Sequence, residues 1–179
     1  MRSAVTLRAC ALVLCGMATI GVVADETGAD ADGTTPLHWA VHHGELESVT
    51  DLLAAGASAD AANRYGVRAS YLAAENGDAA IMRALLDAGA DPNATFAEGE
   101  TLLMTAARTG DVATIEVLLA AGTDVNARER RGGQTALMWA AAEDNGPAIA
   151  ALLAAGAERD ALEATGEFTA IAFAVRAGA

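Results

Sequence analysis

Two short helices in succession are predicted by the apolar positions of residues 33–56. Apolar side chains recur there at the three- and four-residue spacing that places them on one face of a helix. These positions are Leu37, Ala40 and Val41 in the first segment and Val49, Leu52 and Leu53 in the second. Thr35 and Pro36 begin the first segment, since threonine caps helices and proline at the first helical position loses no hydrogen bond. Gly44 and Gly56 follow the segments and end the helices, because glycine adopts the left-handed conformation without a steric penalty.

The same pattern returns along the chain with a period of 33 residues, which is typical of stacked repeats. The counterparts of Gly44 are Gly77, Gly110 and, after a shift of 34, Asp144. Aspartate is one of the few residues that tolerate the left-handed conformation, so Asp144 is compatible with this turn. The one extra residue falls in the loop at residues 128–131. Acidic or amide residues suited to begin a helix follow each turn: Glu45, Asp78, Asp111 and Asn145.

Two stretches of the chain resemble ankyrin repeats. They read TTPLHWAVHHGELESVTDLLAAGASADA and ETLLMTAARTGDVATIEVLLAAGTDVNAR, with a TPLH start and an end similar to GADVNA. The resemblance implies an all-α solenoid of stacked helix-turn-helix units, with a hairpin loop between neighbours, over residues 33–179. It covers about four full repeats plus a partial fifth, and it implies a protein–protein interaction module.

The second repeat departs from this pattern. Its first helix begins with Arg68, Ala69, Ser70 and Tyr71, where the first repeat has Thr35, Pro36, Leu37 and His38. The second repeat therefore lacks the threonine cap and one core leucine, and we expect it to be the least stable. Only the first repeat keeps the histidine, His38, that bridges to the backbone in this family.

The fifth repeat ends after one helix. Ile171, Phe173 and Val175 then have no following helix pair to cover them, which favours self-association through this end of the stack. The alternative is that the chain is a fragment of a longer ankyrin protein whose next residues complete the repeat.

Residues 1–24 predict a secretory signal peptide. Arg2 and Arg8 precede an apolar run, and small residues come directly before Asp25. The run is shorter than the roughly 20 residues that span a bilayer, so an uncleaved anchor is the less favoured alternative. Residues 25–32 are acidic and rich in glycine and alanine, which predicts a flexible lead-in. The expected destination is the periplasm or the outside of the cell, with no membrane association after cleavage.

The charge of the chain is strongly acidic. Its formal net charge is -13, and removal of residues 1–24 takes two of the 11 basic residues and no acidic one, which gives -15. Nucleic acid is therefore not expected as a partner. All basic residues are arginine and alanine is abundant, which fits a bacterial origin. Both cysteines, Cys10 and Cys15, precede Asp25, so disulfide bonds and thiolate catalysis are excluded in the mature chain.

A metal site and catalysis are both disfavoured. His38 and His42 lie one helical turn apart, a spacing by which two imidazoles share a metal ion, and Glu45 is near. No third ligand with zinc-like spacing follows, so we expect neither metal nor cofactor and keep a metal-binding accessory role as an alternative. No nucleophile elbow and no glycine-rich loop with a lysine is present, so we expect no enzyme.

Two tryptophans occupy the same position of the first and fourth repeats. The residues at this position are Trp39, Leu72, Thr105, Trp139 and Phe173. In the family this position faces the core, so packing is the favoured interpretation of Trp39 and Trp139. The alternative is that an indole edge reaches the groove as a binding anchor.

The candidate partner-binding residues follow from the family resemblance, because partners of ankyrin stacks usually contact the concave side. This side consists of the hairpin tips and the two residues before each inter-helix turn. The pairs before the turns are His42 and His43, Glu75 and Asn76, Arg108 and Thr109, and Ala142 and Glu143. The hairpin tips supply Arg64 and Tyr65, Ala97 and Glu98, and residues 128–134 with Arg131. Arginine and tyrosine dominate interface energetics, whereas the alternative is that these arginines keep the tips soluble. We expect a protein partner, whose identity the sequence does not give.

Overall fold

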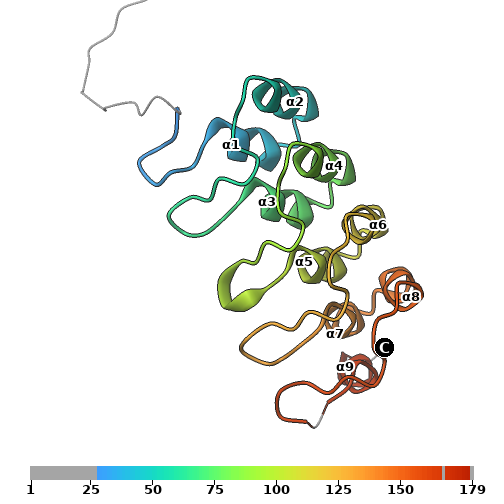
Figure 1. Cartoon of the computed structure of the whole chain (residues 1–179). Coiled ribbons are helices and arrows are strands. Elements are labelled where there is room, and N and C mark those ends of the chain that lie inside the picture. Colours follow the sequence, from blue (N-terminus) through green and yellow to red (C-terminus); the bar gives the residue numbers. More distant parts are fainter. Residues whose placement is uncertain (1–27, 167, 178–179) are drawn as a thin grey trace, which may run out of the picture.

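The computed structural model describes residues 28–166 and 168–177, and within them the helices form two parallel rows (Figure 1). The first row holds the first helix of each repeat: α1 (Pro36–His42), α3 (Ala69–Asn76), α5 (Leu102–Thr109), α7 (Ala136–Ala142) and α9 (Ala170–Ala177). The second row holds α2 (Leu46–Ala54), α4 (Ala79–Asp87), α6 (Val112–Ala120) and α8 (Gly146–Ala154). Each helix from α1 to α8 packs on its partner in the repeat and on its neighbours in the row, and α9 packs on α7. The predicted all-α repeat solenoid is confirmed.

The predicted helix boundaries at the inter-helix turns are confirmed. The turn residues Gly44, Gly77 and Gly110 have φ of 71°, 68° and 77°. Asp144 occupies the same place with φ 54°, so the aspartate adopts the conformation that glycine adopts in the other repeats. Asp78 and Asp111 cap α4 and α6 with their carboxylates, whereas Glu45 and Asn145 begin α2 and α8 without a side-chain cap.

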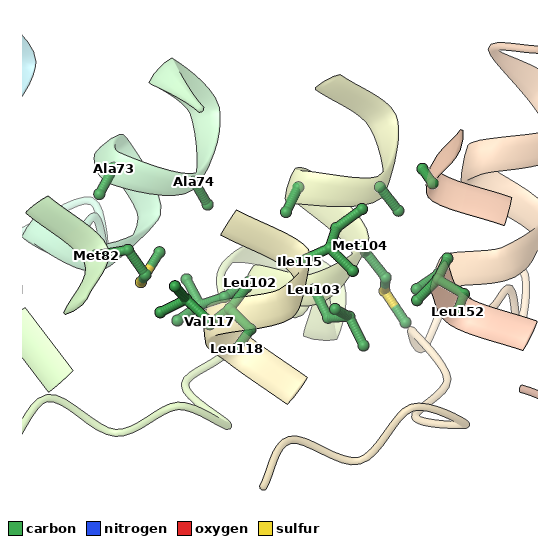
Figure 2. Close-up of a cluster of buried hydrophobic side chains, with 14 of the residues drawn as sticks. Ala73, Ala74, Met82, Leu102, Leu103, Met104, Ile115, Val117, Leu118 and Leu152 are labelled. Carbon is green, nitrogen blue, oxygen red and sulfur yellow. The ribbon is translucent and has the colours of Figure 1, made fainter. Parts of the chain in front are cut away.

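The core lies between the two rows. Figure 2 shows buried side chains from successive repeats spread along this core, among them Met82, Ile115 and Leu152. All three are fully buried. Ala73 and Ala74 on α3 are also fully buried, and their small side chains let neighbouring helices approach closely. The described core is therefore continuous along the stack, as expected for repeats that bury apolar surface mainly against their neighbours.

In the described residues a hairpin precedes the first helix of each of the five repeats, and one position closes each hairpin. The backbone N–H at this position donates to a carbonyl four or five residues later: Asp30 to Thr34, Asn63 to Val67, Phe96 to Glu100, Glu129 to Gln134 and Glu163 to Phe168. A short 3₁₀ helix, η1 (Ala97–Gly99), forms the tip of the third hairpin. The fourth hairpin spans one residue more than the third, so it absorbs the extra residue of the period, as predicted.

The first hairpin includes part of residues 25–32, the segment predicted as a flexible lead-in. Of these residues the structure describes 28–32, and Asp30 and Asp32 belong to the hairpin. The Asp32 carbonyl accepts from the backbone N–H of Arg64 at 2.9 Å, which links the first two hairpins. The repeat pattern thus extends to Asp30, because these backbone groups pair with the next repeat.

The second repeat has the features expected of a weak unit. Arg68 stands at the start of α3 and its side chain makes no cap hydrogen bond. Ser70, at the position of Leu37, is fully buried, and its hydroxyl has no hydrogen-bond partner among the described residues. A buried hydroxyl without a partner is unfavourable.

The last helix, α9, exposes apolar side chains. Ile171 is 65 % exposed and Val175 is 71 % exposed. Their counterparts in the four preceding repeats are at most 3 % exposed, since the next repeat covers them: Leu37, Ser70, Leu103 and Leu137 for Ile171, and Val41, Ala74, Ala107 and Ala141 for Val175. The predicted exposure is confirmed for these two residues, whereas Phe173 is half-buried.

The predicted signal peptide at residues 1–24 lies outside the described residues. Among the helices that the structure describes, none has the length and hydropathy of a membrane span.

Candidate functional site

The hairpins lie beside the row of first helices and away from the second row (Figure 1). We call the surface formed by the hairpin tips and the ends of the first helices the groove face. Most of the candidate partner-binding residues belong to it, and the structure separates them into three groups along the stack.

The largest group surrounds Trp139 in the third and fourth repeats. An apolar hollow of about 210 Å³ is lined by Arg108, Gln134, Met138, Trp139, Ala142, Glu143 and Phe173. A larger hollow of about 580 Å³, with several charged residues in its lining, is lined by Ala97, Glu98, Glu100, Glu129, Arg131, Gly132, Gln134 and Trp139. Trp139 and Gln134 are common to both, so the two hollows are neighbours. The structure thus brings Glu98, Arg108 and Arg131, which are far apart in the sequence, to the rims of neighbouring hollows.

An ion pair connects this group to the second repeat. The Arg108 guanidinium lies 3.8 Å from a carboxylate oxygen of Glu75, and both side chains are substantially exposed. Tyr71 lies nearby: burial raises the pKa of its phenol, and the negative charges of Glu100 and Glu75 act in the same direction. Arg108 opposes this shift because a cation stabilises the phenolate. The candidates Glu75 and Arg108 are therefore paired with each other across the second and third repeats.

Glu129 determines the shape of the fourth hairpin, and the sequence analysis did not single it out. Its carboxylate accepts from the backbone N–H groups of Arg131 at 2.6 Å, Gly132 at 2.6 Å and Gln134 at 3.1 Å. Burial tends to raise the pKa of Glu129, but these hydrogen bonds and the charge of Arg131 hold it below its ordinary value. The period places Glu129 at the position of Asn63, whose side-chain oxygen accepts from two backbone N–H groups of its own hairpin. The period alone could not have shown this role, because Phe96 at the same position has no side-chain oxygen.

The two tryptophans have different surroundings. Trp139 is half-buried against the core and also lines both hollows. Its ring therefore packs in the core, as predicted, and part of it also reaches the groove face. Its indole N–H is buried and has no hydrogen-bond partner within the described part of the chain. Trp39 is 49 % exposed and donates to the Asp30 carboxylate at 3.0 Å. The prediction that Trp39 packs in the core is wrong, because no repeat precedes the first one in the described structure.

A second group consists of exposed rings in the first repeat. The His43 ring stacks on Trp39 with centroids 6.0 Å apart, and the His42 ring lies 5.3 Å from the His43 ring. His38 is only 2 % exposed: its Nδ1 accepts from the Thr35 backbone N–H, so its Nε2 donates to the Val67 carbonyl at 3.0 Å. This confirms the backbone bridge that the family resemblance implies. With His38 engaged, the metal-binding alternative retains only His42 and His43 from the histidine cluster, and no cluster of potential metal ligands occurs in the described residues.

The third group lies at the tip of the second hairpin. The Arg64 guanidinium donates to the Tyr65 hydroxyl at 2.6 Å and lies 4.8 Å from the centre of the tyrosine ring. Tyr65 is 60 % exposed. Arg64 and Tyr65 thus form one aromatic and cationic patch, separate from the two hollows.

Two of the remaining candidates use their polar atoms within the stack. The Asn76 amide donates to the carbonyls of Val41 and His42 at the end of α1. The Thr109 hydroxyl donates to the Ala106 carbonyl of its own helix. Both side chains are exposed, but these donors already have acceptors.

Comparison with known families identifies the repeats. A family model described as "Ankyrin repeats (3 copies)" matches the chain at residues 7–96, 70–162 and 103–179. A comparison with curated proteins gives no match.

Proposed function

The chain belongs to the ankyrin repeat family, and we propose that it is an exported, non-catalytic module that binds a protein partner through its groove face. Ankyrin repeats are generally protein–protein interaction modules, and proteins of the family are typically non-catalytic scaffolds. The observation that carries the proposal is the convergence of Glu98, Arg108 and Arg131 around Trp139. Tryptophan and arginine supply much of the binding energy at protein interfaces, particularly beside hollows that exclude water.

The construction of the groove face supports this role. Backbone hydrogen bonds link neighbouring hairpins, from Arg64 to Asp32, from Arg130 to Glu98 and from Ala164 to Gly132. A surface held in this way is ordered before a partner arrives, which lowers the entropic cost of binding.

Export is the part of the proposal that rests on residues 1–24 alone. Their two arginines, apolar run and small residues before Asp25 have the pattern of a secretory signal. We infer that the partner is in the periplasm or outside the cell, where no cysteine of the mature chain would be exposed to oxidation.

Affinity capture from a periplasmic extract tests the proposal. The bait is the full chain, and the variant bait carries Arg64→Ala, Tyr65→Ala, Arg108→Ala and Arg131→Ala. The matched control replaces Arg83, Arg159 and Arg176 with alanine; these three line neither hollow and remove the same number of charges. A protein retained by the full chain and the control, but lost by the variant, supports the groove face. Retention by all three baits, or loss from the control as well, contradicts it.

A second candidate function is self-association through α9. Ile171 and Val175 are exposed, whereas the residues at the same positions of the other repeats are buried by the next repeat. A second copy of the chain could cover these two side chains. Light scattering separates a dimer from a monomer, and Ile171→Lys with Val175→Lys should convert a dimer to a monomer. A chain that stays monomeric at all concentrations would contradict self-association through α9.

A further inference from the structure

The indole N–H of Trp139 is a buried hydrogen-bond donor that lacks an acceptor in the described residues. The ring packs against the core and borders both hollows. Leaving a buried donor without an acceptor is unfavourable. An acceptor on a bound molecule would remove this cost, so the site favours a ligand that offers a carbonyl oxygen next to the ring.

The first repeat explains why this donor is free. Trp39, at the same repeat position, donates to Asp30, the residue that closes its hairpin. The counterpart of Asp30 in the fourth repeat is Glu129, and its carboxylate is occupied by three backbone N–H groups of its own loop. The fourth repeat therefore has the tryptophan without the internal acceptor, and the donor has no acceptor among the described residues.

The apolar hollow next to Trp139 is suited to one apolar side chain. Met138, Trp139, Ala142 and Phe173 form its apolar lining, and Arg108 and Glu143 are its charged lining residues. The hollow measures about 210 Å³. A large aliphatic or aromatic side chain that enters it would exchange water for contact with three large apolar residues.

The charges at the rims favour a basic ligand. The carboxylates of Glu98 and Glu143 have neither an ion pair nor a side-chain hydrogen bond among the described residues, whereas Arg108 is already paired with Glu75. Arg131 lies close to the Glu129 carboxylate and adds to holding its pKa low. The full chain carries a formal net charge of -13, so its long-range field also attracts cations.

We propose that the Trp139 site binds an extended segment of a partner protein that carries a large apolar residue beside a lysine or arginine. The apolar side chain enters the apolar hollow, and a backbone carbonyl of the segment accepts from the Trp139 indole. The basic side chain pairs with Glu98 or Glu143. This proposal rests on the proposed function, because it identifies the chemistry of the partner at the same groove face.

Selection from a phage-displayed library of random linear peptides on the full chain tests the proposal. The enriched peptides should combine a large apolar residue with an adjacent lysine or arginine. The selected peptides are then synthesised, and their affinities are measured by calorimetry for the full chain and for variants. Trp139→Phe keeps the ring and removes the donor, so binding should weaken about fivefold, the equivalent of one hydrogen bond. Glu98→Gln combined with Glu143→Gln should weaken it at least about threefold and reduce its dependence on salt.

Trp39→Phe is the matched control, since it removes an indole donor at the same repeat position and should leave peptide affinity unchanged. Enrichment of acidic peptides, or of none, overturns the proposal, as does equal weakening by Trp39→Phe and Trp139→Phe. Glu98 and Glu143 are exposed, so their variant tests the charge requirement even where Trp139→Phe does not fold. If peptides bind and none of these variants changes their affinity, the peptides do not bind at the Trp139 site and this proposal is wrong. The capture experiment with the four-residue variant still tests separately whether the groove face binds a partner.

Discussion

At the scale of single residues, the side chain at the position that closes each hairpin differs from repeat to repeat and makes different contacts. Asn63 and Glu129 both use side-chain oxygens to accept from N–H groups of their own loops. Phe96 occupies the same position in the third hairpin and instead packs on Tyr71, with ring centroids 4.4 Å apart. The identity of this one residue thus decides whether a hairpin is held by polar or by apolar contacts.

Glu129→Gln should lower the free energy of unfolding by about 2 kcal/mol at pH 7, because an amide accepts fewer of the three N–H groups and lacks the charge. The pKa of Glu129 is below its ordinary value of 4.5 in the folded protein. The carboxylate therefore contributes fully above that value, and its contribution is lost as the pH falls through the lower folded pKa. Urea denaturation at neutral and acidic pH measures the difference.

Glu98→Gln is the control for this experiment, since Glu98 is exposed and its carboxylate makes no hydrogen bond in the described structure. It should change stability by less than about 0.5 kcal/mol. A difference between Glu129→Gln and the unaltered chain that persists unchanged at acidic pH would show that the charge of Glu129 is not responsible.

Ser70→Ala should raise the free energy of unfolding by about 1 kcal/mol, because it removes a buried hydroxyl that has no partner and replaces it with a better helix former. Ser58→Ala, at an exposed position, should have almost no effect. Thermal unfolding followed by circular dichroism measures both. A loss of stability in Ser70→Ala would mean that the hydroxyl is satisfied, and that Ser70 is not a weakness of the second repeat.

At the scale of elements, the inter-helix turns differ in how tightly the next repeat approaches them. A Cβ atom added to Gly44 would meet no atom within 4 Å. A Cβ atom on Gly110 would lie 2.7 Å from the Asn145 Oδ1 atom. The Asn145 amide donates to the carbonyls of Ala107 and Arg108, so this side chain joins the fourth repeat to the end of α5. The turn at Gly44 therefore requires glycine only because of its left-handed backbone conformation. The turn at Gly110 also requires glycine because a Cβ atom would collide with Asn145.

Gly44→Ala should cost about 1–2 kcal/mol, the price of a left-handed conformation for a residue with a Cβ atom. Gly110→Ala should cost about 1–2 kcal/mol more, because Asn145 must move and lose its hydrogen bonds to α5. Denaturation of the two variants in parallel gives both values. Equal losses would show that the side chain of Asn145 moves aside at no cost.

At the scale of the whole molecule, stability is expected to vary along the stack. The interior helices α5 and α7 each have a repeat on both sides, whereas α9 packs on α7 and has no described helix beyond it. In a linear array each repeat depends on its neighbours, so the ends open before the middle.

Backbone amides of α9 should exchange with solvent at least about tenfold faster than those of α7. Hydrogen exchange measured by mass spectrometry on the full chain tests this expectation. The amides of α5 serve as the internal reference for a helix packed on both sides. Equal protection of α9 and α5 would indicate that the face of Ile171 and Val175 is covered in solution, which would favour self-association.

The sequence by itself determined the helices, their order and their turns, because each depends on local patterns that repeat every 33 or 34 residues. Asp144 is the sharpest case: its substitution for glycine is intelligible from backbone sterics alone, and its φ of 54° agrees. The backbone bridge of His38 and the exposure of Ile171 and Val175 followed from the family resemblance and from the period. These features depend on the residue and its place in the repeat, and not on distant side chains.

The tertiary structure decided what the polar side chains and the tryptophans contact. Trp39 and Trp139 share a repeat position, yet their contacts differ. Trp39 is half exposed and its indole N–H donates to Asp30. Trp139 borders two hollows, and its indole N–H has no acceptor in the described residues. The difference arises from which acceptor the hairpin offers and which repeats lie on either side. A period identifies equivalent positions, but it contains no information about which neighbour occupies the space around each, and the candidate site depends on that.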